Sequence, residues 1–187
     1  RLQGCPIRCA FCDSASTWDS KNGKRMRIDS LVAAAKKEPA NIVVITGGEP
    51  AVHDLRALCQ KLHAAGKRVH IETSGAFALR GKFDFITVSP KKKRPPLPKI
   101  LNKADEIKLI IDSPAAIAYW LKRLPSPLPK KTKAILLQPE FSKHQDPRVL
   151  NAITRAVKTH GNSLPLRATV QLHKLYNADA LDKRAGK

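Results

Sequence analysis

The chain of 187 residues has few aromatic residues, few acidic residues and no long hydrophobic run. Because no stretch of about 18 consecutive apolar residues occurs, the sequence predicts no membrane-spanning helix. Aromatic residues make up 5% of the chain, which is little for a protein that would bind RNA or single-stranded DNA by stacking bases. The length, together with an apolar content of 42%, predicts a single domain over residues 1–187 with a sizeable core.

Acidic residues are scarce relative to basic ones, with 15 Asp and Glu against 35 Lys and Arg and a formal net charge of +20. Such an excess predicts attraction to anionic ligands or partners, with a strong dependence on salt, and does not specify a fold. Two basic clusters, Lys91–Arg94 and Lys130–Lys133, adjoin prolines. We therefore interpret both as solvated loops rather than as a nucleic-acid site.

Cysteine is also scarce, but Cys5, Cys9 and Cys12 lie together in the opening stretch RLQGCPIRCAFCDSASTWD. Such a cluster indicates metal binding more than disulfides. A structural zinc site needs four ligands, usually as two separated pairs, and only the fold could bring a histidine here as the fourth (His53, His70 or His173). Three thiolates instead suit three corners of a cubane iron–sulfur cluster, which leaves one iron open to a non-protein ligand. The alternatives are a zinc loop and thiols that bind no metal. Cys59 adjoins the apolar face of a predicted helix, where we expect a buried thiol.

Strand-like and helix-like segments alternate along the rest of the chain. Strands are predicted within residues 41–50, 67–75, 83–90, 105–112, 133–140 and 165–176, the first as a buried strand. Helices are predicted within 29–38, capped by Asp29 or Ser30, 53–66, closed by Gly66, 113–124, capped by Ser113, and 146–161, capped by Asp146. This alternation is typical of parallel βα units.

Polar, glycine or proline residues follow the predicted strands directly. In parallel α/β folds, ligands bind at the carboxyl ends of the strands. We therefore expect these groups at one edge: Thr46–Pro50, Thr73–Gly75, Ser89–Lys91, Gln138–Pro139 and His173–Lys174. The thiols follow RLQG, which we interpret as the tail of a first strand that begins upstream of Arg1, so they should lie at the same edge.

The spacing Cys-x3-Cys-x2-Cys, with Phe11 directly before the last cysteine, resembles the signature of radical S-adenosylmethionine enzymes. The GGEP sequence at Gly47–Pro50 is similar to the motif of that superfamily that contacts the methionine amino group. The resemblance implies an α/β fold that forms a partial TIM-type βα barrel. It also implies a [4Fe-4S] cluster held by three thiolates, S-adenosylmethionine, and a 5′-deoxyadenosyl radical.

Within that superfamily, the stretches RLQGC, CDS, TWD, VITGGEP, IETSG, VSPK, LQPE and LHK resemble the 7-carboxy-7-deazaguanine synthases over nearly the whole chain. These lyases convert 6-carboxy-5,6,7,8-tetrahydropterin to 7-carboxy-7-deazaguanine with loss of ammonia and use Mg²⁺. The resemblance assigns Cys5, Cys9 and Cys12 to the cluster. Ser14 takes the place of a threonine whose hydroxyl coordinates Mg²⁺, and serine retains that hydroxyl.

The resemblance also assigns residues to the cofactor and the substrate. Arg1 and Thr46 would bind the substrate, Arg1 through its carboxylate. The residues expected to line S-adenosylmethionine are Phe11, Asp13, Gly48, Glu49, Ser89, Pro90, Lys91 and Gln138. His173 and Lys174 are less specific, because a strand-end histidine is commonly structural.

Further expectations concern the setting of the enzyme. We expect a cytoplasmic homodimer that is reduced by a flavodoxin-type electron donor on a basic face. The basic chain end, residues 177–187, is expected to fray. The alternative functions are a glycyl-radical-enzyme activating enzyme, which shares the thiol spacing, and a zinc-bound basic RNA-binding module.

Overall fold

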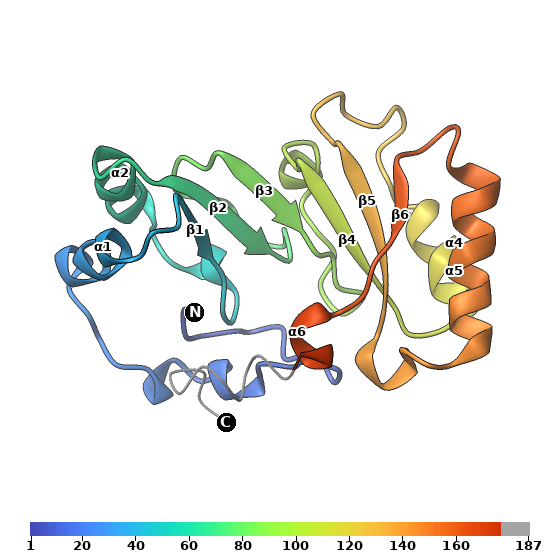
Figure 1. The fold of residues 1–187 in the computed structure, drawn as a ribbon, viewed down its shortest axis with the longest axis horizontal. Coiled ribbons are helices and arrows are strands. Elements are labelled where there is room, and N and C mark those ends of the chain that lie inside the picture. Colours follow the sequence, from blue (N-terminus) through green and yellow to red (C-terminus); the bar gives the residue numbers. More distant parts are fainter. Residues whose placement is uncertain (177–187) are drawn as a thin grey trace. The chain divides into compact units, whose positions relative to one another are not determined.

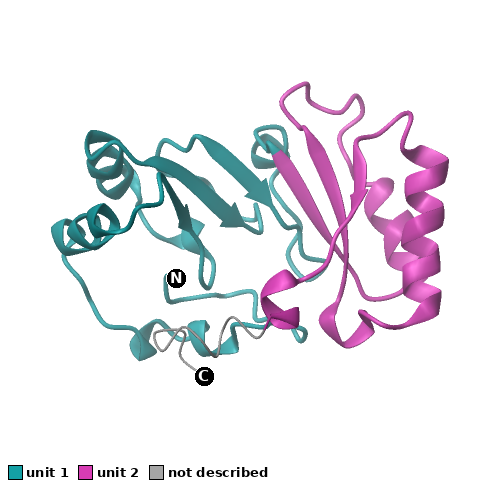
Figure 2. Cartoon of the chain, viewed as in Figure 1, with its two compact units in different colours: residues 1–105 teal, residues 106–187 magenta. Residues whose placement is uncertain are grey.

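The computed structural model describes residues 1–176, and the predicted basic tail at 177–187 lies outside the described residues. The chain divides into two compact units, residues 1–105 and residues 106–187 (Figure 2). Whether they act as the single domain predicted from the sequence stays a prediction. No helix among residues 1–176 is long and apolar enough to cross a membrane.

Unit 1 contains three parallel strands in chain order, β1 (Ile42–Ile45), β2 (Arg68–Thr73) and β3 (Phe85–Val88). The register pairs Val44 of β1 with His70 of β2, and His70 with Phe85 of β3. Its helices are α1 (Ile28–Lys37), α2 (Arg56–Ala64) and the short α3 (Pro98–Leu101). Figure 1 shows α1 and α2 side by side next to β1 and β2. Three 3₁₀ turns complete the unit: Ala15–Thr17, Ser20–Asn22 and Pro50–Val52.

The core of unit 1 lies between α2 and one face of β2. Val69 and Ile71 alternate along β2 and are fully buried, as the sequence predicts. They belong to the same core as the buried α2 residues Leu62 and Cys59, each 1% exposed. The prediction of a buried Cys59 thiol is therefore confirmed, and burial raises its pKa.

The expectation of a buried first strand is wrong for most of β1. Ile42 and Val44 are exposed, and only Ile45 is buried. In the described residues β1 is the outermost strand of its sheet, with β2 on one side. In β1, therefore, a continuous apolar run belongs to a strand that is not covered on both faces.

Unit 2 also contains three parallel strands in chain order, β4 (Glu106–Ile111), β5 (Ala134–Pro139) and β6 (Leu166–Ala168). Its helices are α4 (Pro114–Leu121), α5 (Pro147–His160) and α6 (Leu172–Leu175), and a 3₁₀ turn spans Phe141–Lys143. The strands carry a fully buried aliphatic set: Ile107, Leu109, Ile111, Ile135 and Leu137. Because α4 packs on α5, and α5 on β6, the helices cover this apolar surface.

Two details of the predicted elements are wrong. Helix α1 has Arg27 as its N-cap, and Asp29 lies in the first turn, where its carboxylate accepts a hydrogen bond from Lys61. The predicted strand at 165–176 ends at Ala168, and His173 and Lys174 lie on α6 instead of at a strand end. By contrast, the Asp146 cap is confirmed, because its Oδ1 accepts from the Arg148 backbone N–H at 3.0 Å.

The Asp84 side chain, directly before β3, forms a contact with the backbone of β2. Its Oδ2 accepts a hydrogen bond from the Val69 backbone N–H at 2.7 Å and lies 2.8 Å from His63 Nε2. These contacts hold the pKa of Asp84 below its ordinary value of 3.8, and the hydrogen bond from the Val69 backbone contributes most to this shift. A carboxyl whose pKa is lowered by folding stabilises the folded state above pH 3.8, and this contribution is lost as the pH falls through the lowered value.

We therefore expect Asp84→Asn to lower the free energy of unfolding at neutral pH by about 1 kcal/mol. The difference from the wild-type protein should shrink below about pH 4. Urea unfolding at neutral and acidic pH measures both effects.

Asp54→Asn is the control. The pKa of Asp54 is lowered to about 2 by Arg56, but both side chains are exposed and two residues apart. Since this local contact can persist in the unfolded chain, we expect little change in stability. Equal effects of the two substitutions would contradict the assignment to Asp84.

Candidate active site at the carboxyl ends of β1 and β2

The three predicted metal-binding cysteines lie on one loop that is closed at its base by backbone hydrogen bonds. The Gly4 N–H donates to the Thr17 carbonyl at 2.8 Å, and the Cys5 N–H donates to the Trp18 carbonyl at 3.0 Å. Thr17 is 4% exposed, and its hydroxyl donates to the Ser14 carbonyl at 2.6 Å. The ends of the loop are therefore fixed while its tip stays accessible.

The thiols themselves are half-buried, and none takes part in a disulfide. The Cys12 N–H donates to the Cys9 carbonyl at 3.1 Å, which makes a tight turn of the Cys-x2-Cys segment. Burial raises the pKa of Cys9, Lys91 opposes this shift, and the neighbouring thiols of Cys12 and Cys5 raise it further. The three sulfur groups therefore lie close enough to influence one another.

The arrangement of the thiols bears on which metal group they fit. Among residues 1–176, no three Cys, His, Asp or Glu side chains converge on a point that could hold one metal ion. A zinc ion needs all its sulfur ligands at about 2.3 Å from a single point. In a cubane cluster each thiolate instead binds a different iron atom, so the sulfurs need not converge. The three free, neighbouring thiols fit the cluster better than they fit zinc.

Gly47 and Gly48 bring the thiol loop against the end of β1. Leu2 pairs in parallel with Gly47, since the Leu2 N–H donates to the Thr46 carbonyl at 2.7 Å and the Gly48 N–H donates to the Leu2 carbonyl at 2.8 Å. A Cβ atom on Gly48 would lie 2.5 Å from the Gly4 carbonyl oxygen. The backbone amide of Gly48 therefore binds the N-terminal segment of the chain.

Glu49 joins the end of β1 to the end of β2. The residue is 2% exposed. Oε1 accepts hydrogen bonds from the Ala51 N–H at 3.0 Å and the Thr73 hydroxyl at 2.6 Å. Oε2 accepts from the Ser74 N–H at 2.8 Å and from the Ser74 hydroxyl. The GGEP motif therefore holds the thiol loop through its backbone and β2 through its carboxylate.

The predicted substrate and magnesium residues are hydrogen-bonded to each other. The Arg1 guanidinium donates to the Ser14 hydroxyl, which donates to Asp13 Oδ1 at 3.2 Å. Arg1 and Asp13 are exposed, and Phe11 beside them is 40% exposed. The structure thus brings a cation, a hydroxyl and a carboxylate together directly after the last cysteine.

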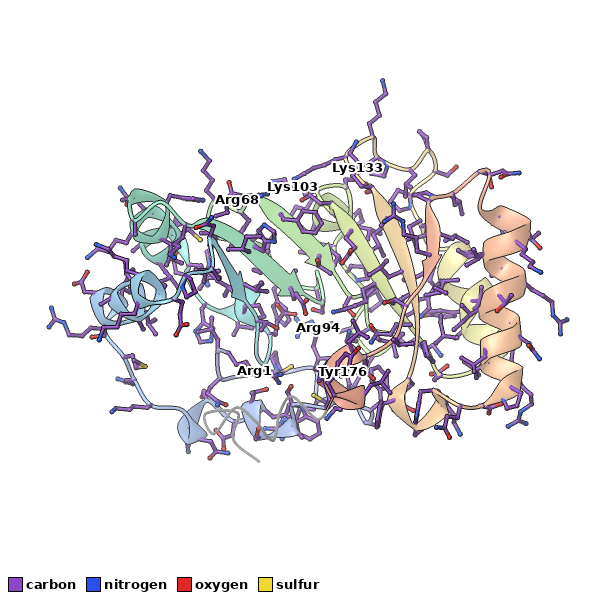
Figure 3. The ribbon with its side chains drawn as sticks, viewed as in Figure 1. Arg1, Arg68, Arg94, Lys103, Lys133 and Tyr176 are labelled. Carbon is purple, nitrogen blue, oxygen red and sulfur yellow. The ribbon has the colours of Figure 1, made fainter. Side chains whose placement is uncertain are left out.

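The segment after β3 lies at the same edge of unit 1. The Ser89 N–H donates to the Thr73 carbonyl at 2.7 Å. Lys91 Nζ in turn donates to the Ser89 carbonyl at 2.8 Å and to the Ser89 hydroxyl at 2.7 Å. Arg1 and Arg94 lie on the side toward which these strands point, and Arg68 lies at the opposite end (Figure 3).

For the remaining predicted site residues, the structure gives a position and a degree of burial. Thr46 directly follows β1 and is half-buried, and Pro90 is buried after β3. Gln138 belongs to unit 2, where it lies on β5 and is 7% exposed. Thr73 and Ser74 lie at the edge where the sequence analysis expected them, but the sequence did not reveal that they bind Glu49.

Gly48→Ala tests whether close backbone contact holds the thiol loop. The added Cβ would meet the Gly4 carbonyl, so we expect most of the bound iron to be lost and the free energy of unfolding to fall by about 1–3 kcal/mol. Iron per chain after anaerobic reconstitution measures the first effect, and urea unfolding the second.

Gly66→Ala is the matched control, because Gly66 has a φ of +75° but open space around a Cβ. It should cost about 1 kcal/mol through backbone strain alone and leave the iron content unchanged. Full iron loading of Gly48→Ala would show that the contact does not position the loop.

Comparisons with known proteins agree with this site. A sequence model of the Radical SAM superfamily matches residues 1–111. A 7-carboxy-7-deazaguanine synthase of Synechocystis is 46% identical over 111 residues, which are 59% of this chain and 53% of that protein. The chain thus matches about half the length of this relative. One from Flavobacterium psychrophilum is 31% identical over 179 residues, covering 95% of this chain and 80% of that protein.

The fold agrees as well. The crystal structure of QueE from Escherichia coli matches with a TM-score of 0.71 and 29% sequence identity, covering 90% of this chain and 83% of that chain. The predicted α/β fold, a partial βα barrel, is therefore confirmed. The thiol loop, the GGEP motif and these matches together show that the chain belongs to the radical SAM superfamily and, within it, to the family of 7-carboxy-7-deazaguanine synthases.

Proposed function

We propose that this protein is a radical SAM carbon–nitrogen lyase that converts 6-carboxy-5,6,7,8-tetrahydropterin to 7-carboxy-7-deazaguanine with loss of ammonia, in queuosine or related 7-deazapurine biosynthesis. One observation carries the proposal. The loop with the three thiols is fixed by backbone hydrogen bonds against the GGEP motif, in a chain whose relatives bear the name of this synthase. We also propose that residues 1–187 act as a single radical SAM domain.

Membership in the superfamily implies a [4Fe-4S] cluster and S-adenosylmethionine. When bound, these groups supply an electron and a carbon radical able to remove a hydrogen atom from the substrate. The chain's part is to hold them: Cys5, Cys9 and Cys12 would bind the cluster, and Glu49 would accept a hydrogen bond from the methionine ammonium group. The other residues proposed to line the cofactor are Phe11, Asp13, Gly48, Ser89, Pro90, Lys91 and Gln138.

Arg1 and Ser14 are proposed to orient the substrate with a magnesium ion. A guanidinium matches a carboxylate in a bidentate pair, and Mg²⁺ prefers oxygen ligands, several of which its ligands or waters supply. Arg1 donates a hydrogen bond to the Ser14 hydroxyl. A substrate carboxylate that pairs with Arg1 is therefore within reach of an ion at Ser14, and Thr46 would contact the substrate from β1.

The net charge supports a proposal about the electron donor. Lys92, Lys93 and Arg94 are exposed, and Lys93 lies close enough to Cys9 for its charge to oppose the burial that raises the pKa of that thiol. A basic surface beside the thiols suits an acidic, flavodoxin-type donor. We further propose a cytoplasmic homodimer.

The test is turnover. Anaerobically reconstituted protein is expected to form the deazaguanine product from S-adenosylmethionine, a reductant and 6-carboxytetrahydropterin, with ammonia released in equal amount. Cys9→Ala, which removes one cluster ligand, should abolish cleavage of S-adenosylmethionine.

Cleavage that depends on an added glycyl-radical protein, without product from the pterin, would support the activating-enzyme alternative and reject the synthase. A colourless protein with one zinc ion would support the RNA-binding alternative.

Ser14→Ala tests the magnesium site. Because it removes the only proposed protein ligand of Mg²⁺ and leaves the thiols in place, we expect turnover to fall about tenfold or more and its Mg²⁺ dependence to weaken. Uncoupled cleavage of S-adenosylmethionine should persist.

Ser16→Ala, which removes an exposed hydroxyl of the same loop, and Ser14→Thr, which keeps the hydroxyl, should both retain Mg²⁺-dependent turnover. Full Mg²⁺-dependent activity in Ser14→Ala would show that the ion binds elsewhere.

A further inference from the structure

The Glu49 carboxylate has its hydrogen-bonding capacity filled by the protein itself. A carboxylate offers about four lone-pair positions. Two are taken by the Ala51 and Ser74 backbone N–H groups, and two by the Thr73 and Ser74 hydroxyls. With Glu49 2% exposed, a cationic ligand must replace one of these donors to gain a good hydrogen bond.

The four donors differ in how readily they can leave. The two N–H groups belong to the backbone of a 3₁₀ turn and of the chain directly after β2, so they leave only if the backbone moves. The Thr73 side chain is β-branched, which restricts its rotation. The Ser74 hydroxyl is on an unbranched side chain, and its second contact, from the Ala76 N–H, is long at 3.2 Å. Ser74 is therefore the donor that a ligand displaces most easily.

We propose that the Ser74 hydroxyl occupies, in the free protein, the position on Glu49 Oε2 that the ammonium group of S-adenosylmethionine takes on binding. This inference rests on the proposed function, because it requires Glu49 to bind the cofactor ammonium. Ser74 then acts as a positioning residue. It keeps a buried carboxylate satisfied while the site is empty, and it lowers the affinity for the cofactor because its bond to Glu49 must first break.

This role predicts an effect opposite to that of an ordinary contact residue. Removing the hydroxyl leaves a buried acceptor unsatisfied in the free protein, which destabilises that state. The incoming ammonium group then finds an open position on Oε2. The variant should be less stable when empty and should bind the cofactor more tightly.

The experiment measures equilibrium binding to anaerobically reconstituted wild-type, Ser74→Ala and Ser74→Thr proteins. The two probes are S-adenosylmethionine and 5′-methylthioadenosine, which lacks the amino acid portion and hence the ammonium group. We expect Ser74→Ala to bind S-adenosylmethionine about tenfold more tightly, as removal of one hydrogen bond to a charged group allows. Its affinity for methylthioadenosine should not change, and Ser74→Thr, which keeps the hydroxyl, should resemble the wild type with both probes.

Thermal unfolding supplies a second readout. Ser74→Ala should melt a few degrees below the wild type without cofactor, and saturating S-adenosylmethionine should narrow that gap. If Ser74→Ala does not load iron, Ser74→Cys replaces it, because a thiol is a weaker donor than a hydroxyl and should tighten binding by a smaller factor.

The outcomes separate the two proposals. Equal or weaker binding of S-adenosylmethionine by an iron-loaded Ser74 variant overturns the role of Ser74. Tighter binding of both probes also overturns it, because the effect would not depend on the ammonium group. If iron-loaded wild-type protein binds no S-adenosylmethionine, the proposed function fails instead.

Discussion

The backbone pairing between the N-terminal segment and the end of β1 is the constraint on which the site depends. Three hydrogen bonds join Leu2 and Gly4 to Thr46, Gly48 and Glu49. The absence of side chains at Gly47 and Gly48 makes this approach possible, since a Cβ on either would meet backbone atoms of the N-terminal segment. This pairing, with the contact of 2.7 Å between His53 Nε2 and the Gln3 carbonyl oxygen, fixes the base of the thiol loop against the segment that carries Glu49.

The carboxylate of Glu49 extends this constraint to β2. Its partners Thr73 and Ser74 end that strand, and Ser89, after β3, donates to the Thr73 carbonyl. The ends of three strands are thus linked by hydrogen bonds to one buried acidic side chain. A buried carboxylate is tolerated only where donors surround it, so the same bonds that satisfy Glu49 also define the edge at which the cofactor is proposed to bind.

Much of the fold could be predicted from the sequence because one-sided burial leaves a clear pattern. Val69 and Ile71 alternate on β2, and Asp146 marks the start of α5. The exposure of β1 could not be predicted, because an apolar run looks the same in an edge strand and in a covered one. The end of β6 at Ala168 was also missed, since the apolar residues at Val170, Leu172 and Leu175 continue the pattern without a strand to pair with.

The site shows the same division between local and distant information. The thiol spacing and the GGEP sequence are local, so they identified the superfamily. The hydrogen bonds between Glu49 and Ser74 join residues 25 positions apart, and neither sequence segment indicates that the other is its partner. Likewise, only the fold shows that Gly47 and Gly48 allow the N-terminal segment of the chain to approach β1 closely.

The burial of Cys59 has a practical consequence for counting reactive sulfur. Cys59 is 1% exposed, whereas the three loop cysteines are half-buried. A thiol-modifying dye added to the folded apoprotein should therefore label three sulfurs quickly and the fourth only after denaturation. Cys59, labelled only after denaturation, then serves as an internal standard. The number of loop cysteines that are bound to a metal group can be measured against it in a single sample.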